Sequence, residues 1–231
     1  MLPAARPTIG AAALVDASPR FFPSRPVTEL ILIRHGETEF NRQGRFQGWI
    51  DAPLNEHGRR QAERLATQLA HERIDALHCS DLLRARQTAA PAAAALGLPV
   101  QADARLREQG FGVLEGLTFA EARERQPEAL DGWCRHQADA APPGGESVRA
   151  FHDRVVSAVR DIAARQAGGR IAVVTHGGVL DMVWRAAHGL PLDGPRVCLI
   201  PNTGLNRVAV DAERLEISGW GEDAHLTGLM R

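Results

Sequence analysis

The sequence predicts an α/β fold: a three-layer α/β/α sandwich around a mostly parallel central sheet. Two short apolar runs rich in β-branched residues, 28–33 and 170–175, have the composition of strands that are covered on both faces. Segments in which apolar residues recur at helical spacing alternate with such runs along the chain. Strand–helix alternation of this kind is typical of a sheet with helices packed on both sides.

The first half of the chain carries recognisable helix starts and stops. Asn55 is a plausible N-cap, because its side chain can accept a hydrogen bond from the free amides of a first helical turn. We expect Asp81 to cap a second helix, and Gly97 to end that helix. The elements expected here are a helix over 56–72, a strand over 74–80, a helix from 81 to about 96 and a short strand over 99–101.

The second half contains an insertion between two regular regions. Thr118 and Glu121 have the spacing of a capping box at a helix start. Residues 127–146 are rich in proline and glycine, and we interpret the segment of about 117–146 as a short lid over a site. The elements expected after it are a helix over 147–167, the strand 170–175, a helix over 179–187 and two antiparallel strands over 203–210 and 215–220.

Composition narrows the classes of function. Lys and Arg number 27 and Asp and Glu 28, a formal net charge of -1, so no charge excess indicates nucleic acid or an anionic membrane as a partner. Any anion site must then be a local cluster of charge. The three cysteines are far apart and form no CxxC, which argues against a disulfide framework or a structural zinc site and favours a cytoplasmic location. No apolar run approaches about 18 residues, so no membrane-spanning helix is expected.

The chain is expected to form one domain over 28–231. Residues 1–27 contain five prolines and little periodicity, so we interpret them as a flexible N-terminal tail. A signal peptide is the alternative, and the short apolar stretch 9–15 favours it only weakly.

Two histidines occupy equivalent places after strands. Arg34-His35-Gly36-Glu37-Thr38 follows the run 28–33 directly, and His176-Gly177-Gly178 follows the run 170–175. Ligands of open α/β sheets bind beyond the carboxyl ends of the strands. If both strands are central and parallel, His35 and His176 lie at the same edge. Either histidine alone would more often be a loop or core residue, whereas two in this setting indicate a site.

Two charged residues between the histidines are further candidates. Arg84 falls in the first turn of its expected helix and can point back over the sheet edge. Glu108 lies in a turn that contains Gly110 and Gly112, where a carboxylate can reach a pocket and exchange protons. Taken singly, each would more often be a solvated surface charge.

Together these motifs resemble the histidine phosphatase superfamily, also called phosphoglycerate-mutase-like. The resemblance covers about residues 28–225, and no core catalytic position departs from the family pattern. The residues that carry it, in chain order, are Arg34-His35-Gly36-Glu37-Thr38, Asn41, Gln47-Gly48, Asp51, Pro53-Leu54, Gly58, Gln61-Ala62, Ser80, Arg84, Thr88-Ala89, Glu108, Gly112, Glu115-Gly116, Gly145-Glu146-Ser147 and Thr175-His176-Gly177.

The resemblance implies a role for each candidate. His35 would attack phosphorus and become a phosphohistidine, and Glu108 would protonate the leaving alcohol and then activate water. The remaining candidates would hold the phosphoryl group: Arg34, Arg84 and His176 around its oxygens, Asn41 as a donor, and Gln47, Gly48 and the backbone of Gly177 along the wall. No metal and no other cofactor is implied, and the sequence contains no HExxH or cluster of carboxylates at metal-ligand spacing.

Phosphatase and mutase remain open alternatives. A mutase must keep water from the phosphohistidine, and cofactor-dependent phosphoglycerate mutases, which this chain resembles at the core, carry a longer insertion with added basic residues. The stretch between Glu108 and Glu146 is short, rich in Ala, Pro and Gly, and free of lysine, which favours hydrolysis of a small-molecule phosphomonoester. Candidate lid contacts to substrate are Arg123, Arg125, Trp133, Arg135 and His136.

A third alternative is a non-catalytic module that keeps a phosphate site, although no catalytic residue of the family is missing. The sequence leaves open a monomer or a homodimer. We note that the strand 204–210 could form an exposed edge able to pair with a second copy.

Overall fold

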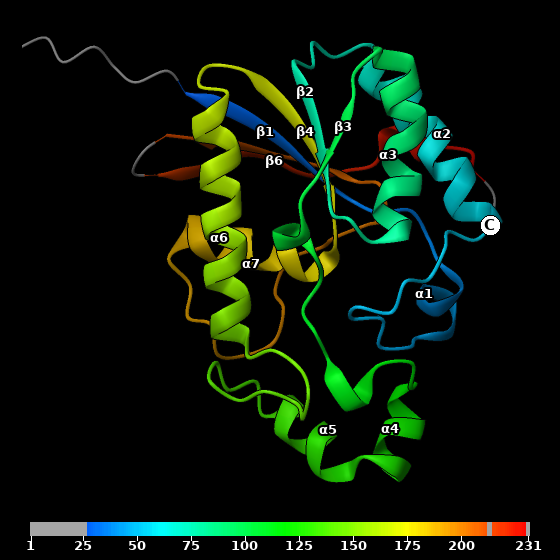
Figure 1. The fold of residues 1–231 in the computed structure, drawn as a ribbon, viewed down its shortest axis with the longest axis vertical. Coiled ribbons are helices and arrows are strands. Elements are labelled where there is room, and N and C mark those ends of the chain that lie inside the picture. Colours follow the sequence, from blue (N-terminus) through cyan, green and yellow to red (C-terminus); the bar gives the residue numbers. More distant parts are fainter. Residues whose placement is uncertain (1–26, 212–213, 230–231) are drawn as a thin grey trace, which may run out of the picture.

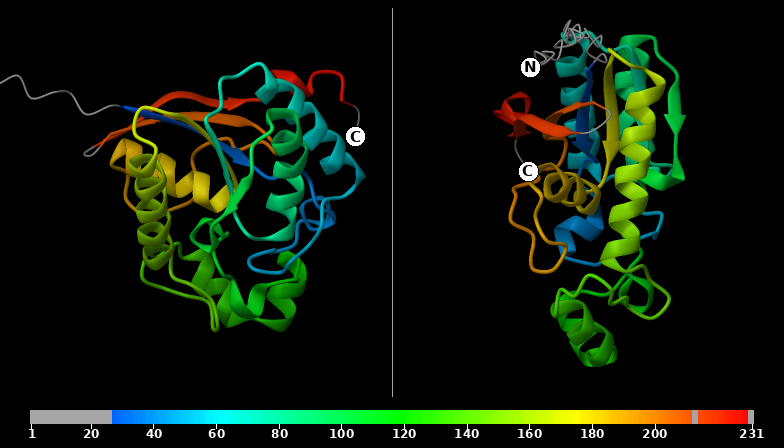
Figure 2. Two further views of the ribbon diagram at one scale, coloured as in Figure 1. Left: turned by 45° about the horizontal axis from the view of Figure 1, so that its top comes forward. Right: turned by 90° about the vertical axis from the view of Figure 1, so that its left-hand side faces the viewer.

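The computed structural model describes residues 27–211 and 214–229, which form the predicted sandwich (Figure 1). The N-terminal tail proposed above lies outside the described residues, apart from Val27. Helices cover both faces of one six-stranded sheet (Figure 2). The strands are β1 (Thr28–Arg34), β2 (Ala76–Cys79), β3 (Val100–Ala102), β4 (Arg170–Thr175), β5 (Leu205–Val210) and β6 (Leu215–Glu222). The helices are α1 (Glu39–Gln43), α2 (Glu56–Ala70), α3 (Leu83–Leu96), α4 (Phe119–Arg125), α5 (Pro127–Cys134), α6 (Val148–Arg165) and α7 (Gly177–His188).

The strand order β3-β2-β4-β1-β5-β6 makes β1 and β4 the central pair. The pairs β1–β4, β4–β2 and β2–β3 are parallel, and β5 runs antiparallel to both of its neighbours. The prediction of a mostly parallel sheet is therefore confirmed. The suggestion that 204–210 forms an exposed edge is wrong, because β5 lies between β1 and β6 and its main chain is paired on both sides.

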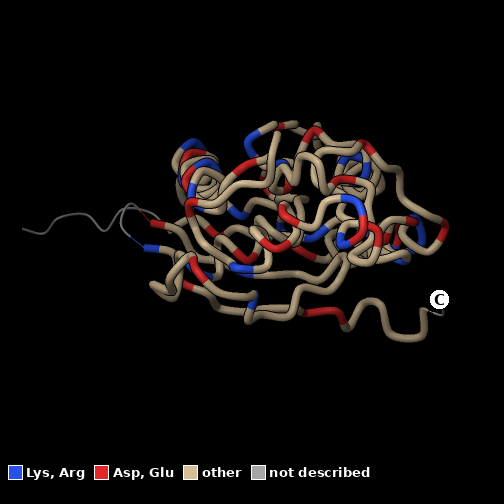
Figure 3. Tube along the Cα trace, turned by 90° about the horizontal axis from the view of Figure 1, so that it is seen from below, with Lys and Arg blue, Asp and Glu red and all other residues tan. Residues whose placement is uncertain are grey.

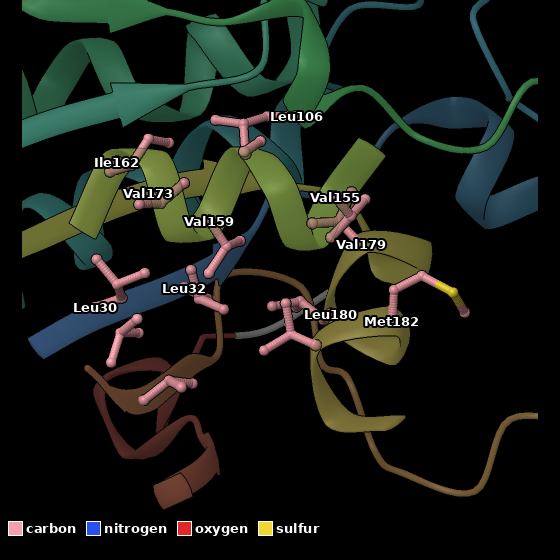
Figure 4. Packing of buried hydrophobic residues seen from close by; sticks show 14 of the residues in the cluster. Leu30, Leu32, Leu106, Val155, Val159, Ile162, Val173, Val179, Leu180 and Met182 are labelled. Atoms are coloured by element: carbon pink, nitrogen blue, oxygen red, sulfur yellow. The ribbon is translucent and has the colours of Figure 1, made fainter. Parts of the chain in front are cut away.

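The continuous apolar run of β1 is explained by its burial on both faces. Leu30 and Leu32 pack toward α6 and α7, whereas Ile31 and Ile33 pack toward α2 and α3. Figure 4 shows the first of these layers, where Leu30, Leu32 and Val173 of the sheet meet side chains of α6 and α7. The side chains of Leu30, Ile31, Leu32 and Ile33 are all fully buried. This packing fixes the position at which the strand ends.

Helix ends are mostly as the sequence indicates. The Asn55 side chain accepts a hydrogen bond from the Gly58 amide, and Gly97 ends α3 in the left-handed conformation. The prediction for Asp81 is wrong: the N-cap position of α3 is Leu82, and Asp81 instead pairs with Arg107 at 2.6 Å. The amide of Leu83 donates to the Asp51 carboxylate at 2.5 Å, so a distant loop supplies the missing acceptor.

The expected lid segment, 117–146, contains α4 and α5, which lie apart from the sandwich at the bottom of Figure 1. The capping box at Thr118 and Glu121 is present as predicted. Proline and glycine do not prevent helix formation here, because Pro127 occupies the first turn of α5, where its missing N–H costs nothing. The short α1, which the sequence analysis did not predict, follows the Arg34–Thr38 motif and is capped by Thr38.

Gly58 offers a test of the packing behind that motif. A methyl group added at Gly58 would overlap the carbonyl oxygen of Glu37, and main chain cannot easily move aside. We expect Gly58→Ala to lower the free energy of unfolding by about 1–3 kcal/mol in urea titrations, although alanine is the better helix former. The matched control is Gly132→Ala in α5, where nothing lies within 4 Å of the added methyl. That variant should be neutral or up to about 1 kcal/mol more stable, and equal effects of the two substitutions would contradict the packing argument.

Candidate active site

The register of β1 against β4 brings the two predicted histidines together. Arg34 pairs with Thr175, and the His35 amide donates to the Thr175 carbonyl at 2.8 Å. His35 and His176, the next residues on the two strands, have ring centroids 5.2 Å apart. Both side chains are buried, at 2% and 0% exposure, so the sheet edge carries an imidazole pair shielded from bulk water.

The hydrogen bond at Nδ1 fixes the tautomer of His35. This nitrogen lies 2.7 Å from the Gly36 carbonyl oxygen, which can only accept, so Nδ1 carries the proton and Nε2 keeps a lone pair. The Gly36 amide donates to Thr88 Oγ1 at 2.9 Å, and the Asn202 side chain donates to the His35 carbonyl at 2.8 Å. Burial, followed by the nearby charges of Arg84 and Arg34, lowers the pKa of His35 well below its ordinary value. The ring is therefore neutral at neutral pH, with its Nε2 lone pair free.

Arg84 is a fully buried guanidinium whose described hydrogen-bond partners are main-chain carbonyls. Nη1 donates to Ile50 O and Nη2 to Gly48 O, each at 2.8 Å, and Nε is buried without a partner among the described residues. Burial lowers the pKa of Arg84 to about 10, against the opposing effect of Glu108, so it remains charged at neutral pH. A buried cation without a carboxylate in direct contact is costly, unless an anion enters beside it.

Arg34 and His176 complete the positive wall. Arg34 Nη1 donates to the Ile200 carbonyl at 2.8 Å, whereas its buried Nε has no partner among the described residues. Burial, followed by the charge of Arg196, lowers the pKa of Arg34 to about 10. Both ring nitrogens of His176 are buried without described partners, and burial and Arg84 lower its pKa well below the ordinary value. These unpartnered groups fit the oxygens of a bound phosphoryl group.

Glu108 lies where the start of α7 meets the loop after β3. Its Oε1 accepts from the Gln109 amide at 3.0 Å and its Oε2 from the Gly178 amide at 3.1 Å. A methyl group at Gly178 would overlap the carboxylate, so only glycine lets Glu108 approach the helix this closely. The Glu108 carbonyl accepts from Trp49 Nε1 at 2.8 Å and from Arg154 at 3.3 Å. Both the carboxylate and its main chain are therefore held in place.

The loop after α1 supplies the remaining predicted residues. Asn41 Oδ1 accepts from the Thr38 amide at 3.1 Å and Gln47 Oε1 from the Thr38 hydroxyl at 2.8 Å, which leaves both NH2 groups as donors. Gly48 has a positive φ of 50°, and its carbonyl is one of the two acceptors that hold Arg84. Gly177 begins α7 beside His176, so the positive end of that helix adds to the anion-binding character.

Two adjoining cavities meet at Glu108. The first, of about 280 Å³, is lined by His35, both predicted arginines, Asn41, Gln47 and Gly48. The second, of about 310 Å³, has mostly apolar walls and lies against α5, α6 and α7. The residues common to both are Glu108, Phe111, Trp133 and Arg196. The two cavities are therefore neighbours, separated by side chains that face both.

The lid residues divide into two groups. Trp133 lines both cavities and His136 lines the second, so their contact with a substrate stays a prediction. Arg123, Arg125 and Arg135 line neither of the two, and Arg123 instead lies over the Phe119 ring and 3.6 Å from Asp131.

Sequence reasoning missed several residues around the site. Arg196 and Asn202 belong to the irregular loop before β5, which has no periodicity to place them. Trp49 and Arg154 act on Glu108 through its main-chain carbonyl, which leaves no motif. Arg154 pairs with the motif residue Glu146 at 2.7 Å, a contact that the sequence does not show.

The chain belongs to the histidine phosphatase superfamily, branch 1, whose family model matches residues 30–223. It is 38% identical over 209 residues to phosphoglycerate mutase-like protein 4 of Arabidopsis thaliana, covering 88% of this chain and 90% of that protein. It is 37% identical over 206 residues to a metal-independent phosphoserine phosphatase of the same plant, covering 88% of this chain and 85% of that protein. The solved structure of Bacillus stearothermophilus YhfR matches with a TM-score of 0.80 and 34% identity over 86% of this chain and 99% of that one.

The resemblance found in the sequence is thus confirmed, and relatives of both kinds support a histidine phosphatase type of function.

Basic and acidic residues are interspersed over the end of the molecule that carries the lid (Figure 3). Within residues 27–211 and 214–229, no group of three or more His, Cys, Asp or Glu has the geometry to hold a metal ion. None of the helices in these ranges is both long and apolar enough to cross a membrane.

The lowered pKa of His35 can be measured directly. Because burial and two arginines oppose protonation, the ring should stay neutral when the pH falls through 6.5, its ordinary value. We expect the imidazole signals of His35 in NMR spectra, assigned by their loss in His35→Ala, to show no titration between pH 8 and about 5.5. A titration midpoint at or above 6.5 would contradict the electrostatic description of the site.

Proposed function

We propose that the protein hydrolyses small-molecule phosphomonoesters through a phosphohistidine at His35. The observation that carries this proposal is the neutral Nδ1–H tautomer of His35, which lines the same cavity as Arg34 and Arg84. A lone pair beside concentrated positive charge is the arrangement needed to attack a phosphate dianion.

In the first step, His35 Nε2 forms a bond to phosphorus while the bond to the ester oxygen breaks. The leaving oxygen takes a proton from Glu108, which lies between the phosphoryl cavity and the second cavity. In the second step, Glu108 takes a proton from water, the water oxygen bonds to phosphorus, and the P–N bond breaks to release phosphate. The same carboxyl group thus serves as acid and then as base.

The positive groups would stabilise the transferring phosphoryl group. Arg34 and Arg84 carry the two charges that balance a phosphate dianion, and the planar guanidinium suits its oxygens. Asn41, Gln47 and the amide end of α7 add neutral donors. Transfer of a phosphoryl group depends mainly on such positioning and charge stabilisation, and needs no metal when guanidinium groups take that role. The relative named a metal-independent phosphoserine phosphatase supports this part of the proposal.

Phosphoglycerate mutase activity is the second candidate, supported by the relative named phosphoglycerate mutase-like protein 4. A mutase and a phosphatase would share the phosphohistidine and differ in whether water reaches it. Release of phosphate from 3-phosphoglycerate, measured beside its conversion to 2-phosphoglycerate, separates the two. The short lid segment favours hydrolysis.

The phosphohistidine can be trapped. We expect brief incubation with a ³²P-labelled phosphomonoester in EDTA, followed by alkaline denaturation, to leave an acid-labile label on the wild-type protein. His35→Ala should carry no label and lose about 10³-fold or more in kcat. Turnover by His35→Ala at the wild-type rate would falsify the covalent mechanism.

The role of Glu108 is tested by the leaving group. Glu108→Gln should lower kcat/KM by about 10²–10⁴-fold for an alkyl phosphate, whose alkoxide needs a proton, and much less for p-nitrophenyl phosphate, whose phenolate does not. The control is Glu63→Gln on the exposed surface of α2, which should leave kcat/KM unchanged for both substrates. Equal losses by Glu108→Gln on both substrates would exclude a general acid at this position.

A further inference from the structure

Arg196 is a cation at the site to which the proposed chemistry gives no task. It lies on the loop between α7 and β5 and lines both cavities. Its guanidinium approaches the start of α7: a methyl built on Gly177 would lie 3.2 Å from Arg196 Nη1 and 3.6 Å from Arg34 Nε. Among the described residues, no acceptor or carboxylate pairs with the Arg196 side chain. Two arginines are thus held near one glycine, and the charge of Arg196 lowers the pKa of Arg34.

This position of Arg196 is built into the fold. Arg185, whose side chain is 5% exposed, donates to the carbonyls of Pro191 at 2.5 Å, Gly194 at 3.0 Å and Pro195 at 2.7 Å. Asp181, also buried, pairs with Arg185 at 3.1 Å. A buried ion pair therefore holds the loop immediately before Arg196.

The same loop is held on its other sides. The Ile200 carbonyl accepts a hydrogen bond from Arg34. The Gly194 amide donates to the main-chain carbonyl of His136, in the lid segment, at 3.1 Å. Arg196 itself is an exposed residue, but the residues on both sides of it are held by these contacts, which places its backbone beside the cavities.

Charge balance indicates what Arg196 would bind. Arg34 and Arg84 match the two charges of a phosphate monoester, His35 and His176 are neutral, and Glu108 is uncharged when it acts as the acid. The charge of Arg196 then exceeds what the phosphoryl group requires. The second cavity, where the leaving group would lie, is otherwise lined by apolar side chains such as Phe151, Met182 and Leu192, by His136, and by Arg185 and Asp181, whose charges pair with each other.

We infer that Arg196 selects phosphomonoesters whose leaving group carries a second anion, such as the carboxylate of a phosphorylated hydroxy acid or amino acid. This inference rests on the proposed function, because it assigns the substrate class of the same site. A cavity of about 310 Å³ is at the small end for ligand pockets, which suits a short carboxylate-bearing leaving group better than a nucleotide.

Matched substrates test the inference. 3-Phosphoglycerate and glycerol 3-phosphate share a skeleton and differ by a carboxylate, as do O-phosphoserine and O-phosphoethanolamine. The ratio of kcat/KM within each pair should favour the carboxylate in the wild type. In Arg196→Gln this ratio should fall about 10- to 100-fold, mostly through KM, as expected for the loss of a charge-assisted contact. Arg196→Lys should restore part of it, and Arg64→Gln, a control on the exposed face of α2, should leave it unchanged.

The outcomes separate this inference from the proposed function. If Arg196→Gln keeps the wild-type ratio, whether or not its overall rate falls, Arg196 does not recognise the second anion and the inference is overturned. If the wild-type protein releases no phosphate from any of these esters or from p-nitrophenyl phosphate, the proposed function itself is overturned, and the inference with it.

Discussion

The parallel pairing of β1 with β4 is the constraint on which the site depends. Both strands are buried on both faces, so their register is set by complete packing of Leu30 to Ile33 and of their neighbours in β4. That register places His35 opposite His176, with the His35 amide bonded to Thr175. A slip of one residue would turn every β1 side chain to the wrong face and move His35 away from His176. The packing that stabilises the core therefore also sets the geometry of the site.

The charges at this edge are arranged at a cost to the fold. In general, two like unit charges about 4 Å apart repel by roughly 4 kcal/mol at an effective dielectric of 20, so gathering cations in one buried pocket is unfavourable. The chain opposes this cost with main-chain carbonyls, which hold Arg84 and Arg34 by their Nη atoms and leave each Nε without a described partner. Carbonyl oxygens orient a guanidinium without neutralising it, so its charge remains available to an incoming anion. Burial, followed by these charges, lowers the pKa of both imidazoles and keeps them neutral.

Sequence alone was sufficient for the sandwich, for its central strands and for the residues gathered at the sheet edge. These depend on local composition and on the rule that parallel strands end at one edge, both of which can be read along the chain. Asp81 and the strand 204–210 were misinterpreted because the outcome depends on distant partners: Asp51 takes over the cap, and β6 covers the expected edge. Arg196 could not be predicted, since a loop without periodicity reaches the site only through contacts that Arg185 makes in three dimensions.

The two halves of the site are supported by different kinds of interaction. The side that carries His35 and His176 is fixed by strand register, where any change disturbs the core. The side around Glu108 and Arg196 is fixed by single arginines that each bind several carbonyls: Arg154 holds the loop of Glu108, and Arg185 holds the loop of Arg196. Side chains presented by such loops can be exchanged while the arginine keeps the loop in place. A fold organised in this way can keep one phosphoryl chemistry and change the alcohols it accepts, which is consistent with relatives named both as a mutase-like protein and as a phosphoserine phosphatase.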